Sequence, residues 1–434
     1  MAQDILTMAD KLWRGELSTA TLHPVDHIGG FVEITDGVGF TPSFANVSAF
    51  DTEDGLVLVD TGSLPLASIV HGDIRRWSAS RLNTAVYSHG HIDHVFGVPI
   101  WEEESKAQGW SPPQVIAHHA LPARFDRYIL TAGYNTIINR RQFGFADLNW
   151  PTKYRYPDQT YHNTLDLSVG GVDFALRHEK GETDDHTITW QADTKVLCCG
   201  DLFIWASPNA GNPQKVQRYP REWAEALRRM LTLDADFLLP GHGLPVMGAD
   251  RVRQALSDTA DLLTSLVDQT LAIMNAGGRL DDAIHTVAPP AELAERPYLR
   301  PVYDEPEFIV HTVWRQYGGW WDGNPATLKP APERALAAEL AELVGGAGVL
   351  ADRAVELLER AGVTENTDEA DHALRLAGHL AEHAWLANPA DVAVAAARQR
   401  VFAARAERAT STMARGVFNW ASKESSEGES PHTH

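Results

Sequence analysis

Hydrophobic and polar residues alternate in the first part of the chain in a way that predicts β-strands. Residues 31–34 alternate, and residues 46–50 and 56–60 flank a turn-like segment, which is typical of a β-hairpin. Residues 63–79 have helix-like spacing, and residues 84–87 form the next short apolar run. Strands in sequence, followed by alternating helix and strand, predict a layered α/β architecture.

Buried runs recur through the middle of the chain, and polar residues follow several of them directly. These runs lie at residues 114–117, 164–167, 172–176, 187–190, 195–201 and 237–239. Polar side chains placed just past buried strands are what an open α/β site requires. The sequence therefore predicts a functional site built from several strand ends.

The pattern becomes helical after about residue 250. Residues 251–276 form a long helical segment, and small apolar residues recur at helical spacing beyond residue 349. Such density predicts tightly packed helical hairpins, which two protomers could share. We predict an α/β domain at residues 1–250, an all-α domain at 251–422 and a polar, disordered tail at 423–434.

Composition narrows the class of protein. The 434 residues carry a formal net charge of -21, which argues against a nucleic-acid binder. No window approaches 18 uninterrupted apolar residues, so we expect no membrane insertion. The two cysteines, Cys198 and Cys199, are neighbours and unsuited to a structural disulfide. With no signal-peptide pattern at the N-terminus, this cysteine usage predicts a cytoplasmic location.

A histidine-rich loop follows the strand predicted at residues 84–87. It carries His89, His91, Asp93 and His94 within six positions. Imidazole and carboxylate are the ligands that zinc accepts, and this spacing directs several lone pairs into one small volume. The alternative is a polar surface turn, but we predict a metal site.

Three further strand ends carry candidate ligands, namely Glu182, Asp201 and His242. Each alone is a weak signal, whereas the ordered set is a strong one. His118 and His119 also follow a buried run, and we interpret them as a solvated or hydrogen-bonded pair rather than as ligands.

The ordered motifs resemble the metallo-β-lactamase fold over about residues 25–250. His89 to His94 has the H-x-H-x-D-H form of that family, and its other landmarks match Asp60-Thr61-Gly62, Gly200-Asp201 and Pro240-Gly241-His242. The resemblance implies an αββα sandwich.

Within this family, the third motif resembles the alkylsulfatase branch. Most members place a histidine where Glu182 stands here, and the alkylsulfatases have a glutamate. The branch is also matched by Tyr87-Ser88-His89, Arg140-Arg141 and Trp320-Trp321-Asp322-Gly323-Asn324-Pro325. The resemblance implies that the helical region is a dimerisation domain, and hence a homodimer.

The resemblance also implies a ligand set for two zinc ions. One zinc would be held by His89, His91 and Glu182, and the second by Asp93, His94 and His242, with Asp201 bridging them. Asp93 and His94 would act in catalysis together with a metal-activated water. The rival ligand at the third motif is His186 or, less favoured, His178.

We therefore predict a dinuclear zinc hydrolase that cleaves a sulfate ester. The cations expected to bind the anionic substrate are Arg140, Arg141, Lys215 and Arg218. The alternatives are a hydrolase of a carboxylic ester, lactone, thioester or phosphoester on the same metals, and a non-catalytic dimeric metal-binding module. No segment resembles the sterol-carrier-like domain of long-chain alkylsulfatases, which favours a smaller ester.

Overall fold

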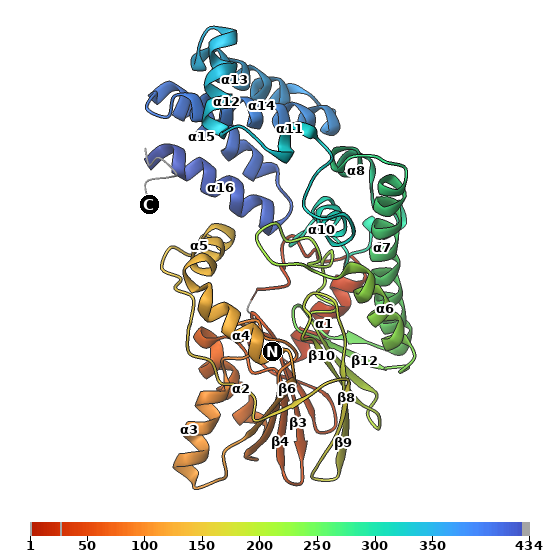
Figure 1. Cartoon of the computed structure of the whole chain (residues 1–434). Coiled ribbons are helices and arrows are strands. Elements are labelled where there is room, and N and C mark those ends of the chain that lie inside the picture. The colour runs from red at the N-terminus through yellow and green to blue at the C-terminus, as the bar shows by residue number, and fades with distance from the viewer. Residues whose placement is uncertain (1, 27, 428–434) are drawn as a thin grey trace. The chain divides into compact units, whose positions relative to one another are not determined.

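The first of two β-sheets has seven strands in chain order (Figure 1). The computed structural model describes residues 2–26 and 28–427. The first three pairings in this sheet are antiparallel and the last three are parallel. Its strands are β1 (Val32–Thr35), β2 (Val38–Thr41), β3 (Val47–Thr52), β4 (Gly55–Val59), β5 (Leu82–Val86), β6 (Gln114–His118) and β7 (Gln159–Tyr161).

The second sheet has six strands in the order β13-β12-β11-β10-β9-β8, and only the β11–β12 pairing is parallel. Cys198 and Cys199 lie on β11, and both are free and buried, as their adjacent positions predict. The strands are β8 (Thr164–Val169), β9 (Val172–His178), β10 (Thr187–Gln191), β11 (Val196–Gly200), β12 (Phe237–Pro240) and β13 (Val246–Met247).

Strand β4 shows how the two sheets and their helices form layers. All its residues are buried. Val57 and Val59 belong to the hydrophobic core between the sheets, whereas Leu56 and Leu58 pack into a second cluster with the helices of the first sheet. Since successive side chains of a strand point to opposite faces, burial of both faces requires a layer on each side.

The outer layers of this sandwich are helical. The first sheet is covered by α2 (Ala67–Trp77), α3 (Val98–Gln108) and α4 (Leu121–Leu130). The second is covered by α6 (Pro220–Leu231) and α7 (Ala249–Asn275). The predicted αββα architecture is therefore confirmed.

The chain divides into two compact units. One comprises residues 1–133 and 150–320, and the other comprises residues 134–149 and 321–434. These compact units divide the chain at other positions than residue 250. The domain boundary predicted at residue 250 stays a prediction. Besides the layers above, the first unit contains α1 (Ala2–Trp13), η1 (Leu64–Leu66), the start of α5 (Ala132–Phe143), α8 (Leu280–Thr286), α9 (Ala291–Ala294) and α10 (Pro306–Gly318).

The second unit is helical, as expected for this part of the chain. Small residues such as Ala354, Ala377 and Ala381 are buried where its helices pack together. Among the described helices of the protein, none is both long and apolar enough to cross a membrane. The helices of this unit are most of α5, α11 (Pro325–Leu328), α12 (Glu333–Val344), α13 (Ala347–Val363), α14 (Thr367–Ala387), α15 (Val392–Arg408) and α16 (Thr412–Glu427).

The end of α16 corrects one expectation. The polar tail was expected to be disordered from residue 423, but the helix continues to Glu427. Ser425 explains part of this, because its hydroxyl accepts a hydrogen bond from the buried Arg398. The rest of the predicted tail, residues 428–434, lies outside the described residues.

Candidate metal centre

Asp60 orients the histidine-rich loop from the end of β4. Its φ of 62° lies in the left-handed region, which aspartate tolerates better than most residues. One carboxylate oxygen accepts a hydrogen bond from the backbone N–H of Ser88 at 2.7 Å. The other accepts from the Ser88 hydroxyl at 2.8 Å and contacts His94 Nδ1 at 2.7 Å. A proton on Nδ1 leaves the lone pair of His94 on Nε2.

The first group of candidate ligands comes from the loop after β5 and the loop between β9 and β10. His89 Nε2 and His91 Nδ1 lie 2.7 Å apart. Glu182 Oε2 lies 3.6 Å from the former and 3.5 Å from the latter. His89 and Glu182 are completely buried. Three potential donor atoms therefore converge on one point.

The second group lies beside it. Asp93 Oδ2 is 3.5 Å from His94 Nε2 and 3.4 Å from His242 Nε2. His242 follows β12, and its Nδ1 contacts the Phe44 carbonyl oxygen at 2.5 Å, so its Nε2 is also the inward nitrogen. Hydrogen bonds that fix the outer nitrogen of an imidazole are typical of metal-ligating histidines.

Asp201 lies between the two groups. Its Oδ2 is 3.7 Å from His89 Nε2 and 3.2 Å from His242 Nε2, and its Oδ1 is 3.4 Å from His94 Nε2. The position of Gly241 has no room for a side chain, since a Cβ there would lie 2.1 Å from Asp201 Oδ1. The structure thus brings all seven predicted ligands together in two groups, one of His89, His91, Glu182 and Asp201 and the other of Asp93, His94 and His242.

The donor atoms fit a cation. His94 Nε2, Glu182 Oε2 and Asp201 Oδ1 are buried and have no hydrogen-bond partner among the described residues. Leaving such atoms unsatisfied is costly, and ligation of a divalent metal would satisfy them. Two groups of imidazoles sharing carboxylates suit zinc, for which nitrogen and oxygen ligands in small numbers are usual.

The surroundings of the candidate ligands shift their pKa values in different directions. Burial holds the pKa values of His89 and His91 well below the usual range, helped by the neighbouring histidines at His89 and by Arg218 and Arg124 at His91. Both imidazoles therefore keep a lone pair at neutral pH. Burial tends to raise the pKa of Asp201, but the His242 and His94 imidazoles hold it well below its usual range. Burial raises the pKa of Glu182 to about 8, with Asp201 adding to the effect. Without a cation, the centre therefore disfavours charge on Glu182.

Two of the predicted substrate-binding cations lie near Glu182. Arg218 is 2% exposed, and its guanidinium contacts Glu182 itself. Lys215 lies over the Trp150 ring, 5.6 Å from its centroid. Burial and the charge of Arg218 lower the pKa of Lys215 to about 7, against the pull of Asp93 and Glu182.

The other two predicted cations belong to the second unit. The Arg140 Nε donates to the Leu148 carbonyl oxygen at 2.7 Å. The Arg141 guanidinium lies 5.5 Å from the centroid of the Trp420 ring. Both contacts are made within that unit, so a role for these arginines in substrate binding stays a prediction.

His186 and His178, the alternatives to Glu182 as the third-motif ligand, make other contacts. His186 Nε2 accepts a hydrogen bond from the Asp201 backbone N–H at 3.2 Å, and His186 is not in either group of converging ligands. His178 Nδ1 contacts the His186 carbonyl oxygen, and its ring stacks on His118. His118 also contacts His119, as expected for a hydrogen-bonded pair. This geometry favours Glu182 as the third-motif ligand.

Sequence reasoning missed a second support of the histidine-rich loop. Asp185 Oδ2 accepts a hydrogen bond from the Gly90 backbone N–H at 2.9 Å, and its Oδ1 accepts from Arg124 Nε at 2.8 Å. A Cβ at Gly90 would lie 2.7 Å from the Arg124 side chain. The only available signal was the acidic pair Asp184-Asp185 after the third motif.

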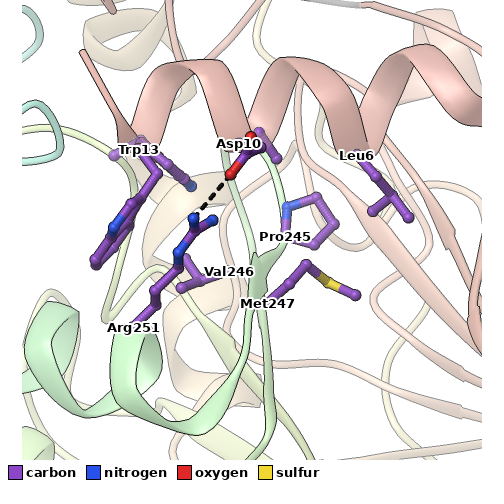
Figure 2. Close-up of a pocket in the computed structure, with 9 residues that line it drawn as sticks. Leu6, Asp10, Trp13, Pro245, Val246, Met247 and Arg251 are labelled. Atoms are coloured by element: carbon purple, nitrogen blue, oxygen red, sulfur yellow. Dashed lines mark hydrogen bonds and ion pairs between the residues drawn. The ribbon is translucent and has the colours of Figure 1, made fainter.

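A separate pocket lies elsewhere in the first unit. Its volume is about 280 Å³, and the ion pair between Asp10 and Arg251 measures 2.8 Å. Figure 2 shows the residues that line it, with Asp10 facing Arg251. The lining includes Trp13 and Trp205 but none of the candidate metal ligands. It is therefore distinct from the centre described above.

Two family models match the chain. The metallo-beta-lactamase superfamily matches residues 40–242, and alkyl sulfatase dimerisation matches residues 279–428. The first range contains all seven candidate ligands, and the second contains the helices α8 to α16.

The chain is similar in sequence to curated alkylsulfatases. The chain is 27% identical over 318 residues to the linear primary-alkylsulfatase of Pseudomonas sp. (strain ATCC 19151), covering 68% of this chain and 60% of that protein. It is 25% identical over 378 residues to the alkyl/aryl-sulfatase BDS1 of Saccharomyces cerevisiae, covering 80% and 57%. The chain thus spans about three fifths of the length of these curated relatives.

Among solved structures, the stereoselective inverting sec-alkylsulfatase Pisa1 from Pseudomonas sp. superposes with a TM-score of 0.80. The identity is 23%, and the match covers 93% of this chain and 66% of the other. At this identity the likeness shows the fold, and it extends over both compact units.

Proposed function

We propose that this chain, which matches the metallo-β-lactamase superfamily over residues 40–242 and alkyl sulfatase dimerisation over residues 279–428, is a dinuclear zinc hydrolase of sulfate esters. The observation that carries the proposal is the convergence of seven ligand side chains in two groups, with Asp201 between them. The sulfate ester as substrate is supported by the alkylsulfatases to which the chain is similar.

The ligand roles follow the two groups. His89, His91 and Glu182 would hold one zinc, and Asp93, His94 and His242 would hold the other, with Asp201 shared. Bound in this way, the two ions would supply Lewis acidity and lower the pKa of a water for attack on the ester.

The remaining roles belong to residues of this chain. Asp60 and the Phe44 carbonyl oxygen fix the rings of His94 and His242, so that neither ring has to reorient during turnover. Asp93 is a ligand whose side chain is partly exposed, so its carboxylate can also accept a hydrogen bond from the attacking water. We assign the catalytic roles to Asp93 and His94.

Lys215 is our candidate for binding the sulfate. Its ammonium interacts electrostatically with Asp93 and Glu182, which places its charge close to the metal centre. A cation in a poorly solvated position binds an anion more strongly than the same cation in water. Arg218, which was predicted for the same task, contacts Glu182, and its role in substrate binding stays a prediction.

We also propose that the protein acts as a homodimer through its helical region. The match of residues 279–428 to alkyl sulfatase dimerisation supports this assembly. Sedimentation velocity on the purified protein tests it, since a species of one chain at micromolar concentration would contradict the proposal.

Metal analysis followed by a substrate panel tests the function. Protein reconstituted with zinc should bind two ions per chain and should release sulfate from alkyl sulfates of short or intermediate length. Carboxylic esters, lactones, thioesters and phosphoesters serve as competing substrates. Turnover of one of these with no sulfate release would overturn the sulfatase assignment, and full metal occupancy without any turnover would indicate a non-catalytic module.

A further inference from the structure

Glu182 stands in the ligand set with one oxygen engaged and the other open. Its Oε2 faces His89 and His91 and has no hydrogen-bond partner among the described residues. Its Oε1 is contacted by two buried side chains, Arg218 and Asn209. The two oxygens of one carboxylate therefore have different surroundings.

Arg218 contacts Glu182 at two points. Its Nη1 donates to the Glu182 backbone carbonyl oxygen at 2.5 Å, and its Nη2 lies 3.4 Å from Oε1. Both side chains are about 2% exposed or less. A buried arginine is held by its partners, and its planar group can contact backbone and carboxylate together. This arrangement fixes the main chain and the side chain of the same residue.

Asn209 approaches Oε1 from the segment between β11 and α6, which also carries Arg218. Its Nδ2 donates to Glu182 Oε1, and the residue is 5% exposed. A carboxylate can only accept hydrogen bonds, so the amide nitrogen rather than the amide oxygen must face it. Oε1 is thus hydrogen-bonded by a neutral donor and neutralised by a cation.

The loop that carries Asn209 is anchored by a segment beyond the sandwich. Asp304 Oδ2 accepts a hydrogen bond from the Gly211 backbone N–H at 2.6 Å, and the Ser207 N–H donates to the Arg300 carbonyl oxygen at 2.9 Å. A Cβ at Gly211 would lie 2.3 Å from the backbone nitrogen of Ile309, so the two segments are in close contact. All of these residues belong to the first unit.

We propose that Arg218 and Asn209 are positioning residues that restrict Glu182 to a single ligating oxygen, an inference that rests on the proposed metal function. A free carboxylate can bind a cation through one or both oxygens. With Oε1 engaged, Glu182 offers one donor atom, as an imidazole does. We call Arg218 and Asn209 together the clamp. By engaging Oε1, the clamp lets a glutamate occupy the third-motif position, where an imidazole would otherwise supply the ligand.

Zinc binding by variants of the full chain tests this proposal without any substrate. Asn209→Ala and Arg218→Met should weaken one of the two zinc sites by about tenfold to a hundredfold, the range usual for residues that orient a ligand. The measurement is competition with a chromophoric chelator. Asn212→Ala is the matched control: Asn212 is a buried amide on the same loop whose side-chain oxygen accepts a hydrogen bond from the Gln214 N–H. It should bind zinc like the unmodified protein.

Two further measurements separate positioning from folding. The metal-free Asn209→Ala protein should keep the melting temperature and far-ultraviolet circular dichroism of the unmodified metal-free protein. Arg218→Lys should recover only part of the zinc affinity, because an ammonium cannot contact the backbone and the carboxylate in the manner of a guanidinium. If Arg218→Met does not fold, Asn209→Ala still decides the question.

Unchanged affinity at both zinc sites in Asn209→Ala and Arg218→Met would overturn the clamp and leave the proposed hydrolase intact. Weakened zinc binding in these variants would support the clamp even if no sulfate ester is hydrolysed. The failure of either proposal is therefore distinguishable from the failure of the other.

Discussion

The carboxylate of Asp60 contacts His94 Nδ1 at 2.7 Å and so presents His94 Nε2 to the metal centre. Asp60 directly follows β4, whereas His94 belongs to the loop after β5. Because these two strands are parallel neighbours, their carboxyl ends lie at the same edge of the sheet. The orientation of a candidate ligand therefore follows directly from the strand pairing.

Replacing Asp60 with asparagine tests this relationship. Asparagine tolerates the left-handed backbone at this position, so the loop should keep its path. Its amide nitrogen cannot accept hydrogen bonds, and one of the donors now satisfied by the carboxylate loses its partner. We expect zinc affinity to fall about tenfold to a hundredfold. Chelator competition measures this, and an affinity equal to that of the unmodified protein would refute the role given to Asp60.

Gly241→Ala should damage the centre through volume alone. The added methyl group would meet Asp201 Oδ1 at 2.1 Å, so the shared carboxylate has to move. We expect a loss of about 1–3 kcal/mol in the free energy of unfolding and a loss of zinc. Gly133→Ala is the control, because nothing lies within 4 Å of a Cβ there. Denaturant unfolding and metal analysis should show that Gly133→Ala has the stability and zinc content of the unmodified protein. Zinc retained in Gly241→Ala would contradict the prediction.

Substrate binding should depend on pH through Lys215. A lysine carries its charge below its pKa, which burial and Arg218 lower here to about 7. The cation is therefore lost as the pH rises through about 7, and KM for an alkyl sulfate should increase above that pH by about tenfold to a hundredfold.

Lys215→Arg provides the comparison, because arginine keeps its charge throughout this range. Its KM should change little between about pH 6 and 9, whether or not its absolute value matches that of the unmodified protein. A KM for the unmodified protein that is equally independent of pH would exclude Lys215 as the sulfate-binding cation.

Arg398 should be a stability residue of the helical unit. It is 3% exposed and lies over the Trp385 ring at 3.9 Å, and it pairs with Glu382 at 2.8 Å and Glu424 at 3.0 Å. Both glutamates are partly exposed, which reduces the cost of leaving them without a partner. We expect Arg398→Met to lower the free energy of unfolding by about 3 kcal/mol. Thermal melts followed by circular dichroism measure this, and a change below about 0.5 kcal/mol would show that the pairs contribute little.

Most of the candidate ligands could be predicted because they follow buried strands, whereas Glu182 lies after β9, a strand that is only partly buried. The histidine-rich loop follows β5, Asp201 follows β11 and His242 follows β12. The turn-like segment between residues 46–50 and 56–60 likewise predicted the hairpin that β3 and β4 form. Local pattern was sufficient in these cases, since strand ends in a layered α/β fold gather at the edges of the sheets.

The residues that support the ligands could not be predicted from local pattern. Asp185 contacts Gly90 across 95 positions of the chain, and Asn209 contacts Glu182 across 27. Nothing in the sequence around Arg218 distinguishes a cation that holds a ligand from one that binds a substrate. Such pairings depend on how loops fold over the sheet edge, which alternation and spacing do not encode.

We propose that the seven converging side chains form a two-zinc centre that hydrolyses sulfate esters. The most direct test is a titration of metal-free protein with zinc in which bound metal and sulfate released from an alkyl sulfate are measured on the same samples. We predict that sulfate release rises with zinc and saturates at two ions per chain. Saturation of zinc binding at two ions with no sulfate released from any alkyl sulfate, or no zinc bound at all, would contradict the account.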